Sequence, residues 1–465
     1  MKVKTLTRNP DEYLRETKRD LHKRKFKNLF KKKSFKFSAP RNYDPSLHPY
    51  EAAREYTRAL NATKLERVFA KPFVGNLDGH KDGVSSVCTH PKYLSVYLSG
   101  ACDGEVKIWN LPTRTCQRTI LAHDGEVKGI TFASDKEHFI TVGNDKSIKT
   151  WKYSKAEEEE EEEEEADEPT NTIFSRKILT GITHHRNKPL FATCGEICQL
   201  WEETRNEPVK SFQWGIDGLL DVKFNQVQTN LLAACSSDRS VILYDTRDVG
   251  PMRKVVMKLK TNQLAWNPME AFTFTCANED YNLYTFDTRH LKSPINVHQD
   301  HTSAVDTVDY SPTGREFVSG SHDKSIRIYE VNKGHARDIY HTKRMQKLKC
   351  VSWSLDNKYI ISGSDETNIR VWKARASEKL GVLKPRERMA LNYSSALINK
   401  FAAHPQIRRI ARHRQIPKHI YNAQAELRTI REKQKKKESN RRAHSRPGTV
   451  PFVSERSKHV VREET

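Results

Sequence analysis

Two stretches of the chain share one pattern: residues 102–110 are CDGEVKIWN, and residues 144–152 are NDKSIKTWK. Each stretch has a turn containing Asp, then alternating apolar and polar residues, and then an aromatic residue. The alternation is typical of a half-buried β-strand. The pattern returns as SDRSVILYD at residues 237–245 and as HDKSIRIYE at residues 322–330. The sequence therefore contains an internal repeat whose unit includes a strand.

The aromatic residue of the repeat occurs seven times, at intervals of 42 or 43 residues apart from a single interval of 50, and its positions are Trp109, Trp151, Trp201, Tyr244, Phe286, Tyr329 and Trp372. A period of about 43 residues matches a four-stranded propeller blade. We therefore predict an all-β fold, a seven-bladed WD-repeat β-propeller, over residues 68–373. The segment 68–73 should be the strand that closes the ring onto blade seven, because closure removes exposed sheet edges.

In three copies a histidine precedes the turn Asp by 22 or 23 residues, and the pairs are His80 with Asp103, His123 with Asp145, and His301 with Asp323. A buried Asp is tolerated only when its oxygens accept hydrogen bonds. We predict that the His, a strand Ser or Thr, the Asp and the aromatic residue (Trp109, Trp151) form a structural and non-catalytic polar set. The third copy has Glu196 in place of the Asp, and copies four and five lack the Gly-His pair. Those blades should depend more on packing.

The net charge of +22 is unevenly distributed. Residues 1–78 contain 20 Lys and Arg against 9 Asp and Glu, and residues 373–465 contain 24 against 8. Basic arms on a near-neutral core favour a polyanionic partner, most often nucleic acid, although solvated tails have the same composition. No signal peptide, membrane span or zinc-site spacing of cysteines is visible. We expect an intracellular protein without metal or cofactor.

The N-terminal arm, residues 1–67, is predicted to be partly disordered. Its stretch 22–39 is strongly basic and contains Phe26, Phe30, Phe35 and Phe37. Aromatic residues among lysines can stack on bases, but a weakly ordered insertion has the same composition, and both interpretations stay open. Nine consecutive glutamates at 157–165 predict a self-repelling loop over 155–170. A solvating role is favoured for this loop over competition with nucleic acid.

The C-terminal arm, residues 374–465, has helical periodicity, with a possible apolar seam at Leu391, Ala396, Leu397 and Phe401. The next segment carries four arginines that are candidates for RNA phosphate contacts, because a guanidinium matches phosphate oxygens: Arg408, Arg409, Arg412 and Arg414. A second helix is predicted over residues 419–437. The lysines at 435–437, and those at 31–33, are candidate nuclear import signals.

Longer strings give the chain a recognisable resemblance. They are RNYDP at 41–45, LNATKLERVFAKPF at 60–73, ANEDYNLY at 277–284, YHTKRMQ at 340–346 and RIARHR at 409–414. In these strings the chain resembles the Sof-type WD-repeat proteins of the small-subunit processome, whose vertebrate members are also called DDB- and cullin-associated factors. The resemblance covers nearly the whole chain, but the basic stretch near 22–39 and the glutamate run depart from the family pattern.

The resemblance implies a nucleolar scaffold that assembles on pre-ribosomal RNA with the box C/D small nucleolar ribonucleoprotein and other processome proteins. Such a scaffold is needed for ribosomal RNA processing and small-subunit biogenesis. The residues alone indicate only a basic-armed intracellular binding protein. They do not tell which RNA segment, protein neighbour or propeller face is involved.

A second function class is a substrate receptor of a cullin–RING ubiquitin ligase. Blades four and five end in aromatic-Asp-Thr-Arg boxes, whose charged residues are Asp245 and Arg247, and Asp287 and Arg289. These boxes look like those by which propellers dock the DDB adaptor, although each Arg can equally pair only with its own Asp. The two functions are compatible. An enzyme is the weakest interpretation, because the sequence shows no nucleophile–base pair, phosphate loop or metal set.

Overall fold

The computed structural model describes residues 44, 47, 50–153, 168–215 and 217–464. The basic stretch 22–39, the lysines at 31–33 and the glutamate run 157–165 lie outside the described residues. The chain divides into two compact units, of which the smaller comprises residues 1–65 and 383–410 and the larger comprises residues 66–382 and 411–465.

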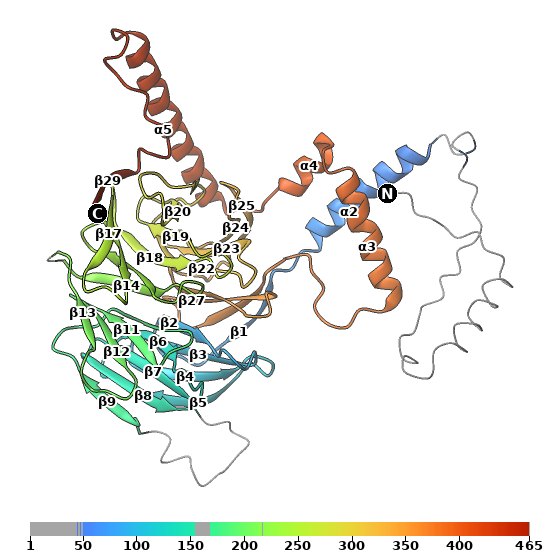
Figure 1. The fold of residues 1–465 in the computed structure, drawn as a ribbon. Helices are drawn as coiled ribbons and strands as arrows, with labels where there is room; N and C mark the ends of the chain where they lie inside the picture. The colour runs from blue at the N-terminus through green and yellow to red at the C-terminus, as the bar shows by residue number, and fades with distance from the viewer. Residues whose placement is uncertain (1–43, 45–46, 48–49, 154–167, 216, 465) are drawn as a thin grey trace, which may run out of the picture. The chain divides into compact units, whose positions relative to one another are not determined.

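The larger unit is a seven-bladed propeller, as the repeat predicts (Figure 1). Blades one to three consist of β2 (Val84–Thr89), β3 (Val96–Ala101), β4 (Glu105–Asn110) and β5 (Thr115–Leu121); β6 (Val127–Phe132), β7 (His138–Gly143), β8 (Ser147–Lys152) and β9 (Asn171–Phe174); and β10 (Gly181–His184), β11 (Leu190–Cys194), β12 (Cys198–Glu202) and β13 (Lys210–Phe212).

Blade four has five strands, which are β14 (Leu219–Phe224), β15 (Leu231–Ser236), β16 (Ser240–Asp245), β17 (Pro251–Met257) and the C-terminal β29 (Val460–Glu464). Blades five and six consist of β18 (Thr261–Trp266), β19 (Thr273–Asn278), β20 (Leu283–Asp287) and β21 (Asn296–His298); and β22 (Val305–Tyr310), β23 (Glu316–Ser321), β24 (Ile326–Glu330) and β25 (Ala336–Tyr340). Blade seven combines β26 (Leu348–Trp353), β27 (Tyr359–Ser364) and β28 (Ile369–Lys373) with β1 (Phe73–Leu77).

The ring is closed by β1, which is antiparallel to β28 and pairs Leu77 with Ile369. The sequence placed this closing strand at residues 68–73, and the structure has it at 73–77 because the helix α2 (Glu51–Val68) continues to Val68. Each innermost strand contacts the innermost strand of the next blade, and β26 contacts β2. The repeated aromatic residues lie in the third strand of every blade, where Trp109, Trp151 and Trp372 are almost completely buried.

The smaller unit has a core of helices. α2, α3 (Pro385–Lys400) and α4 (Pro405–Arg412) pack through a cluster that contains Ala59, Leu397 and Ile407, with Phe401 partly buried beside it. Leu391 and Ala396, which the sequence placed in the same apolar seam, are exposed. The seam is therefore narrower than the periodicity suggested.

α5 (Lys418–Ala443) belongs to the larger unit. Its first turn is anchored by Ile420, which is 1% exposed, and Arg431 donates a hydrogen bond of 3.2 Å to the side chain of Asn282 in blade five. Beyond Arg431 nearly every residue of the helix is exposed, including the three lysines at 435–437. No helix in the described part of the chain is long and apolar enough to cross a bilayer.

Candidate functional site

The polar set is fully assembled in blade two. Nδ1 of His123 lies 2.9 Å from Asp145, and Nε2 lies 2.8 Å from the hydroxyl of Thr141. Trp151 donates its indole N–H to the same hydroxyl at 3.0 Å, and Ser147 donates to Asp145 at 2.8 Å. These five side chains therefore link the loop before the blade to its second and third strands.

Blade six has the same His–Ser–Asp contacts around a deeper Asp, but the hydroxyl of its aromatic residue, Tyr329, has no hydrogen-bond partner among the described residues. Asp323 is 2.9 Å from Nδ1 of His301 and accepts a hydrogen bond of 2.6 Å from Ser325. The buried Arg327 has its Nη2 3.6 Å from the same carboxylate. Because His301, Ser325 and Arg327 stabilise the charged form, the pKa of Asp323 is held far below its usual range in spite of burial.

In blade one the set is only partly formed. Nε2 of His80 is 2.6 Å from the hydroxyl of Ser99, which also accepts the indole N–H of Trp109 at 2.7 Å. Asp103 accepts the backbone N–H of Glu105 at 3.1 Å, but its other oxygen and Nδ1 of His80 have no hydrogen-bond partner among the residues that the structure describes. Burial lowers the pKa of His80 to about 4, helped by the charge of Lys107. The imidazole is therefore neutral at neutral pH.

The two aromatic-Asp-Thr-Arg boxes have closely similar geometry. Arg247 donates from Nη2 to Asp245 at 2.6 Å and from Nε at 3.1 Å, and Arg289 donates to Asp287 at 2.8 Å and 3.1 Å through the same two atoms. These hydrogen bonds lower the pKa of both carboxyls. The arginine side chains nevertheless remain 72% and 66% exposed. Each Arg thus pairs with its own Asp and still presents a face of its guanidinium to solvent.

A second feature common to the boxes was missed by sequence reasoning. Lys210, in the outermost strand of blade three, donates to the carbonyls of Thr246 and Arg247 at 2.7 Å and 3.2 Å. Arg253, in the equivalent strand of blade four, donates to the carbonyls of Thr288 and Arg289 at 3.2 Å and 3.4 Å. A cation from the preceding blade therefore holds the backbone of each box. Only the three-dimensional neighbourhood of the blades shows this relation.

The four arginines of the C-terminal arm lie in different environments. Arg408 and Arg409 belong to the smaller unit, and Arg412 and Arg414 belong to the larger one. The first three are exposed. The side chain of Arg414 is only 17% exposed, with Nε 3.7 Å from Asp338.

Asp338 is the centre of a cluster of arginines within the larger unit. Arg67 and Arg337 both reach its carboxylate at 3.2 Å. Burial, together with the neighbouring charge of Arg67, lowers the pKa of Arg414. The guanidinium of Arg414 is thus engaged within the protein, whereas Arg408, Arg409 and Arg412 are accessible to a ligand. The described residues contain no group of three or more His, Cys, Asp or Glu side chains placed to hold a metal ion.

Comparison with known proteins agrees with this architecture. The WD domain, G-beta repeat, matches residues 71–110, 114–152, 292–330 and 334–373, and the Sof1-like domain matches residues 374–460. DDB1- and CUL4-associated factor 13 of Danio rerio is 56% identical over 99% of both chains, and that of Homo sapiens is 55% identical with the same coverage. Protein SOF1 of Saccharomyces cerevisiae is 42% identical over 99% of this chain and 94% of that protein.

Proposed function

This chain belongs to the family of Sof1-like WD-repeat proteins, and from that membership we propose that it is a scaffold of the nucleolar small-subunit processome. In this role it is required for pre-ribosomal RNA processing and for biogenesis of the small ribosomal subunit. The observation that carries the proposal is similarity over nearly the full length, which includes both the propeller and the basic C-terminal arm.

The partners that we propose are pre-ribosomal RNA, the box C/D small nucleolar ribonucleoprotein and other processome proteins. The exposed cations of the C-terminal arm support an RNA contact, because a guanidinium can donate two parallel hydrogen bonds to phosphate oxygens. Arg408, Arg409 and Arg412 are the accessible candidates, whereas Arg414 acts mainly through Asp338.

The test is the salt dependence of RNA binding. Each phosphate contact to single-stranded RNA contributes roughly 0.7 to the slope of log affinity against log salt, so Gln at 408, 409 and 412 together should reduce the slope by about 2. The same protein should leave pre-ribosomal particles on sedimentation, and precursor RNA should accumulate. Arg414→Gln is the matched control, which should lower stability but leave the slope unchanged. An unaltered slope and particle association in the triple variant would show that this segment binds protein.

A second function, that of a substrate receptor in a cullin–RING ubiquitin ligase, is favoured by the two boxes. Two of the named relatives, those of Danio rerio and Homo sapiens, are called DDB1- and CUL4-associated factor 13. We propose that Arg247 and Arg289 dock the adaptor of the ligase, because each is fixed by its own Asp and by a cation of the preceding blade, yet stays exposed.

The double change Arg247→Ala and Arg289→Ala should abolish co-purification of the adaptor without affecting sedimentation with pre-ribosomal particles. A control with the same loss of charge is available in blades three and six. Near the end of the third strand of these blades, Arg205 pairs with Glu202 and Lys333 pairs with Glu330. Alanine at 205 and 333 should leave adaptor recovery unchanged. If the double change at 247 and 289 also leaves it unchanged, these arginines serve only within their blades.

A further inference from the structure

The loop that joins blades six and seven, residues 341–347, overlaps the string YHTKRMQ at 340–346, which the function proposed above does not use. The loop is held in place from both sides. Met345 is 1% exposed and packs in the hydrophobic cluster of blade seven with Leu348 and Trp372. Nε2 of His341 lies 3.2 Å from the carbonyl of Gln415. The exposed side chains between His341 and the buried Leu348 therefore project from a fixed backbone.

Three of these side chains are cationic and exposed, namely Lys343, Arg344 and Lys347. None of them forms an ion pair with any residue that the structure describes. Lys324 is exposed on the turn of blade six and donates a hydrogen bond of 2.9 Å to Gln346, which adds a fourth cation beside the loop. The sequence from 339 to 355 contains no Asp or Glu.

Neighbouring carboxylates on the same blades are already neutralised. Asp323 lies 3.6 Å from Arg327, Asp365 lies 3.0 Å from Lys349, and Glu366 pairs with Arg370. No local acid therefore cancels the charge of the loop.

Corresponding loops elsewhere in the ring differ in this respect. In each of the loops before blades one, three and five, a lysine forms an ion pair with a glutamate of the same blade. The pairs are Lys81–Glu105 at 2.5 Å, Lys177–Glu196 at 2.7 Å and Lys260–Glu279 at 3.3 Å. Before blade seven the cations have no such partner. This difference marks the loop as a surface for an external anion.

The chemistry of the loop favours a polyanion over a protein partner. No large hydrophobic side chain of residues 341–347 is exposed, and protein interfaces usually bury apolar or aromatic residues at their centre. Lysine and arginine without apolar neighbours are typical of contacts to a phosphate backbone.

We propose that Lys343, Arg344 and Lys347, with Lys324 beside them, bind an RNA phosphate backbone on the face of the ring where the innermost strands begin. The inference rests on the proposed role in pre-ribosomal RNA processing and adds to it a propeller face and a set of residues. The contact is distinct in sequence from the arginines of the C-terminal arm.

The experiment measures binding of the full chain to a labelled oligouridine over a range of salt concentrations. Gln at 343, 344 and 347 together should reduce the log–log slope by about 2, at roughly 0.7 per lost contact. The control is Gln at 136, 188 and 358, which removes three exposed lysines from turns at the opposite ends of the innermost strands. It should leave the slope unchanged. Thermal melting should be the same in both variants, because all six side chains are exposed.

The other possible results contradict either the loop proposal or the RNA contact on which it rests. Equal slope changes in the two variants would show that only total charge matters, and the proposed contact would be lost. An unchanged slope with loss of sedimentation in pre-ribosomal particles would assign the loop to a protein partner. If the unaltered chain itself binds no RNA, the RNA contact of the proposed function fails, and the loop proposal fails with it.

Discussion

Blade two and blade four have the same strand order but different interiors. In blade two, Thr141 faces Lys149 across the second and third strands, and the hydroxyl of Thr141 joins the His-Asp-Trp network. In blade four the equivalent pair is Ala234 opposite Ile242, and both side chains are completely buried. The histidine and the hydroxyl of the set are therefore both replaced in blade four. A hydrogen-bond network is favourable only when its members are satisfied, which accounts for the loss of both groups in this blade.

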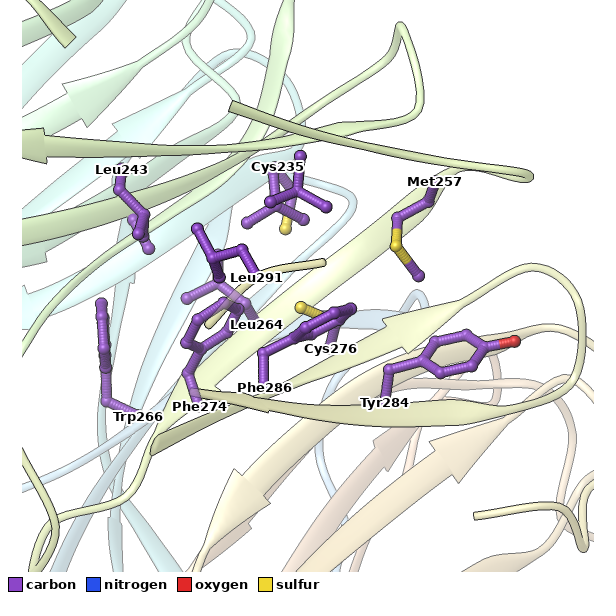
Figure 2. Close-up of a cluster of buried hydrophobic side chains, with 13 residues drawn as sticks. Cys235, Leu243, Met257, Leu264, Trp266, Phe274, Cys276, Tyr284, Phe286 and Leu291 are labelled. Atoms are coloured by element: carbon purple, nitrogen blue, oxygen red, sulfur yellow. The ribbon is translucent and has the colours of Figure 1, made fainter. Parts of the chain in front are cut away.

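Where the hydrogen-bond network is missing, the packing of apolar side chains stabilises the blade. Figure 2 shows the cluster between blades four and five, in which Leu243, Trp266 and Phe274 lie among other buried apolar side chains. Asp238, the turn Asp of blade four, is bonded to Lys254 of the fourth strand, β17, at 2.6 Å in place of a histidine. In the sheet, Lys254 of β17 lies opposite Glu464 of β29, so this strand adds backbone pairing at the outer edge of blade four. The difference teaches that the blade geometry can be stabilised from its centre or from its rim.

The largest expected effect on stability distinguishes the turn Asp of blade six, which is bonded to a histidine, from that of blade four, which is bonded to a lysine. Asp323→Ala should lower the free energy of unfolding by about 3–5 kcal/mol, because it leaves the buried charge of Arg327 without its carboxylate. Asp238→Ala should cost about 1–2 kcal/mol, since its side chain is 22% exposed and water can replace its bonds. Denaturant unfolding of both variants measures the difference. Equal costs would mean that the two turns are held in the same way.

A second, smaller effect is the pH dependence that the buried histidines introduce. Burial lowers the pKa of His80 and of His298 to about 4, whereas an unfolded histidine titrates near 6.5. As pH falls from about 6.5 toward 4, the unfolded chain takes up protons that the folded chain does not. Stability is therefore lost over this window, and it is fully present above it.

The variant His80→Gln isolates that contribution. One pKa unit corresponds to about 1.4 kcal/mol, so between neutral pH and pH 5 the unaltered chain should lose roughly 2 kcal/mol more than the variant. Urea midpoints at the two pH values test this expectation. A parallel loss in both proteins would show that His80 is protonated in the folded state.

An interaction could be predicted from the sequence when its partners lie close together along the chain. The seven blades followed from a local pattern, since each turn Asp and aromatic residue lie in one hairpin of about ten residues. The pairing of Arg247 with Asp245 is also local, and its possibility could be stated from the sequence. Residues brought together by the ring were harder to predict, and the strand β29 was not predicted at all. It pairs with β17, some two hundred residues earlier in the chain, and its sequence has no feature that indicates an edge partner.

Arg414 is a second case in which a contact between residues far apart in the sequence could not be predicted. Four arginines in seven residues predict a surface for phosphate, because nothing local indicates where a guanidinium will be buried. Asp338, in the outermost strand of blade six, is the tertiary partner that separates Arg414 from the other three. The helices of the arm were predicted, but their contacts could not be.

The smallest expected effects compare blades one and three, where the polar set is incomplete for different reasons. Asp103→Ala should cost about 1 kcal/mol, because the carboxylate holds only the backbone N–H of Glu105 and no histidine. Glu196→Ala should cost less than about 0.5 kcal/mol, since it pairs with Lys177 and both side chains are more than half exposed. Chemical denaturation at neutral pH would order the two variants. If Glu196→Ala proved the more destabilising change, the glutamate would fill the place of the missing Asp, and blade three would belong with the blades held from their centre.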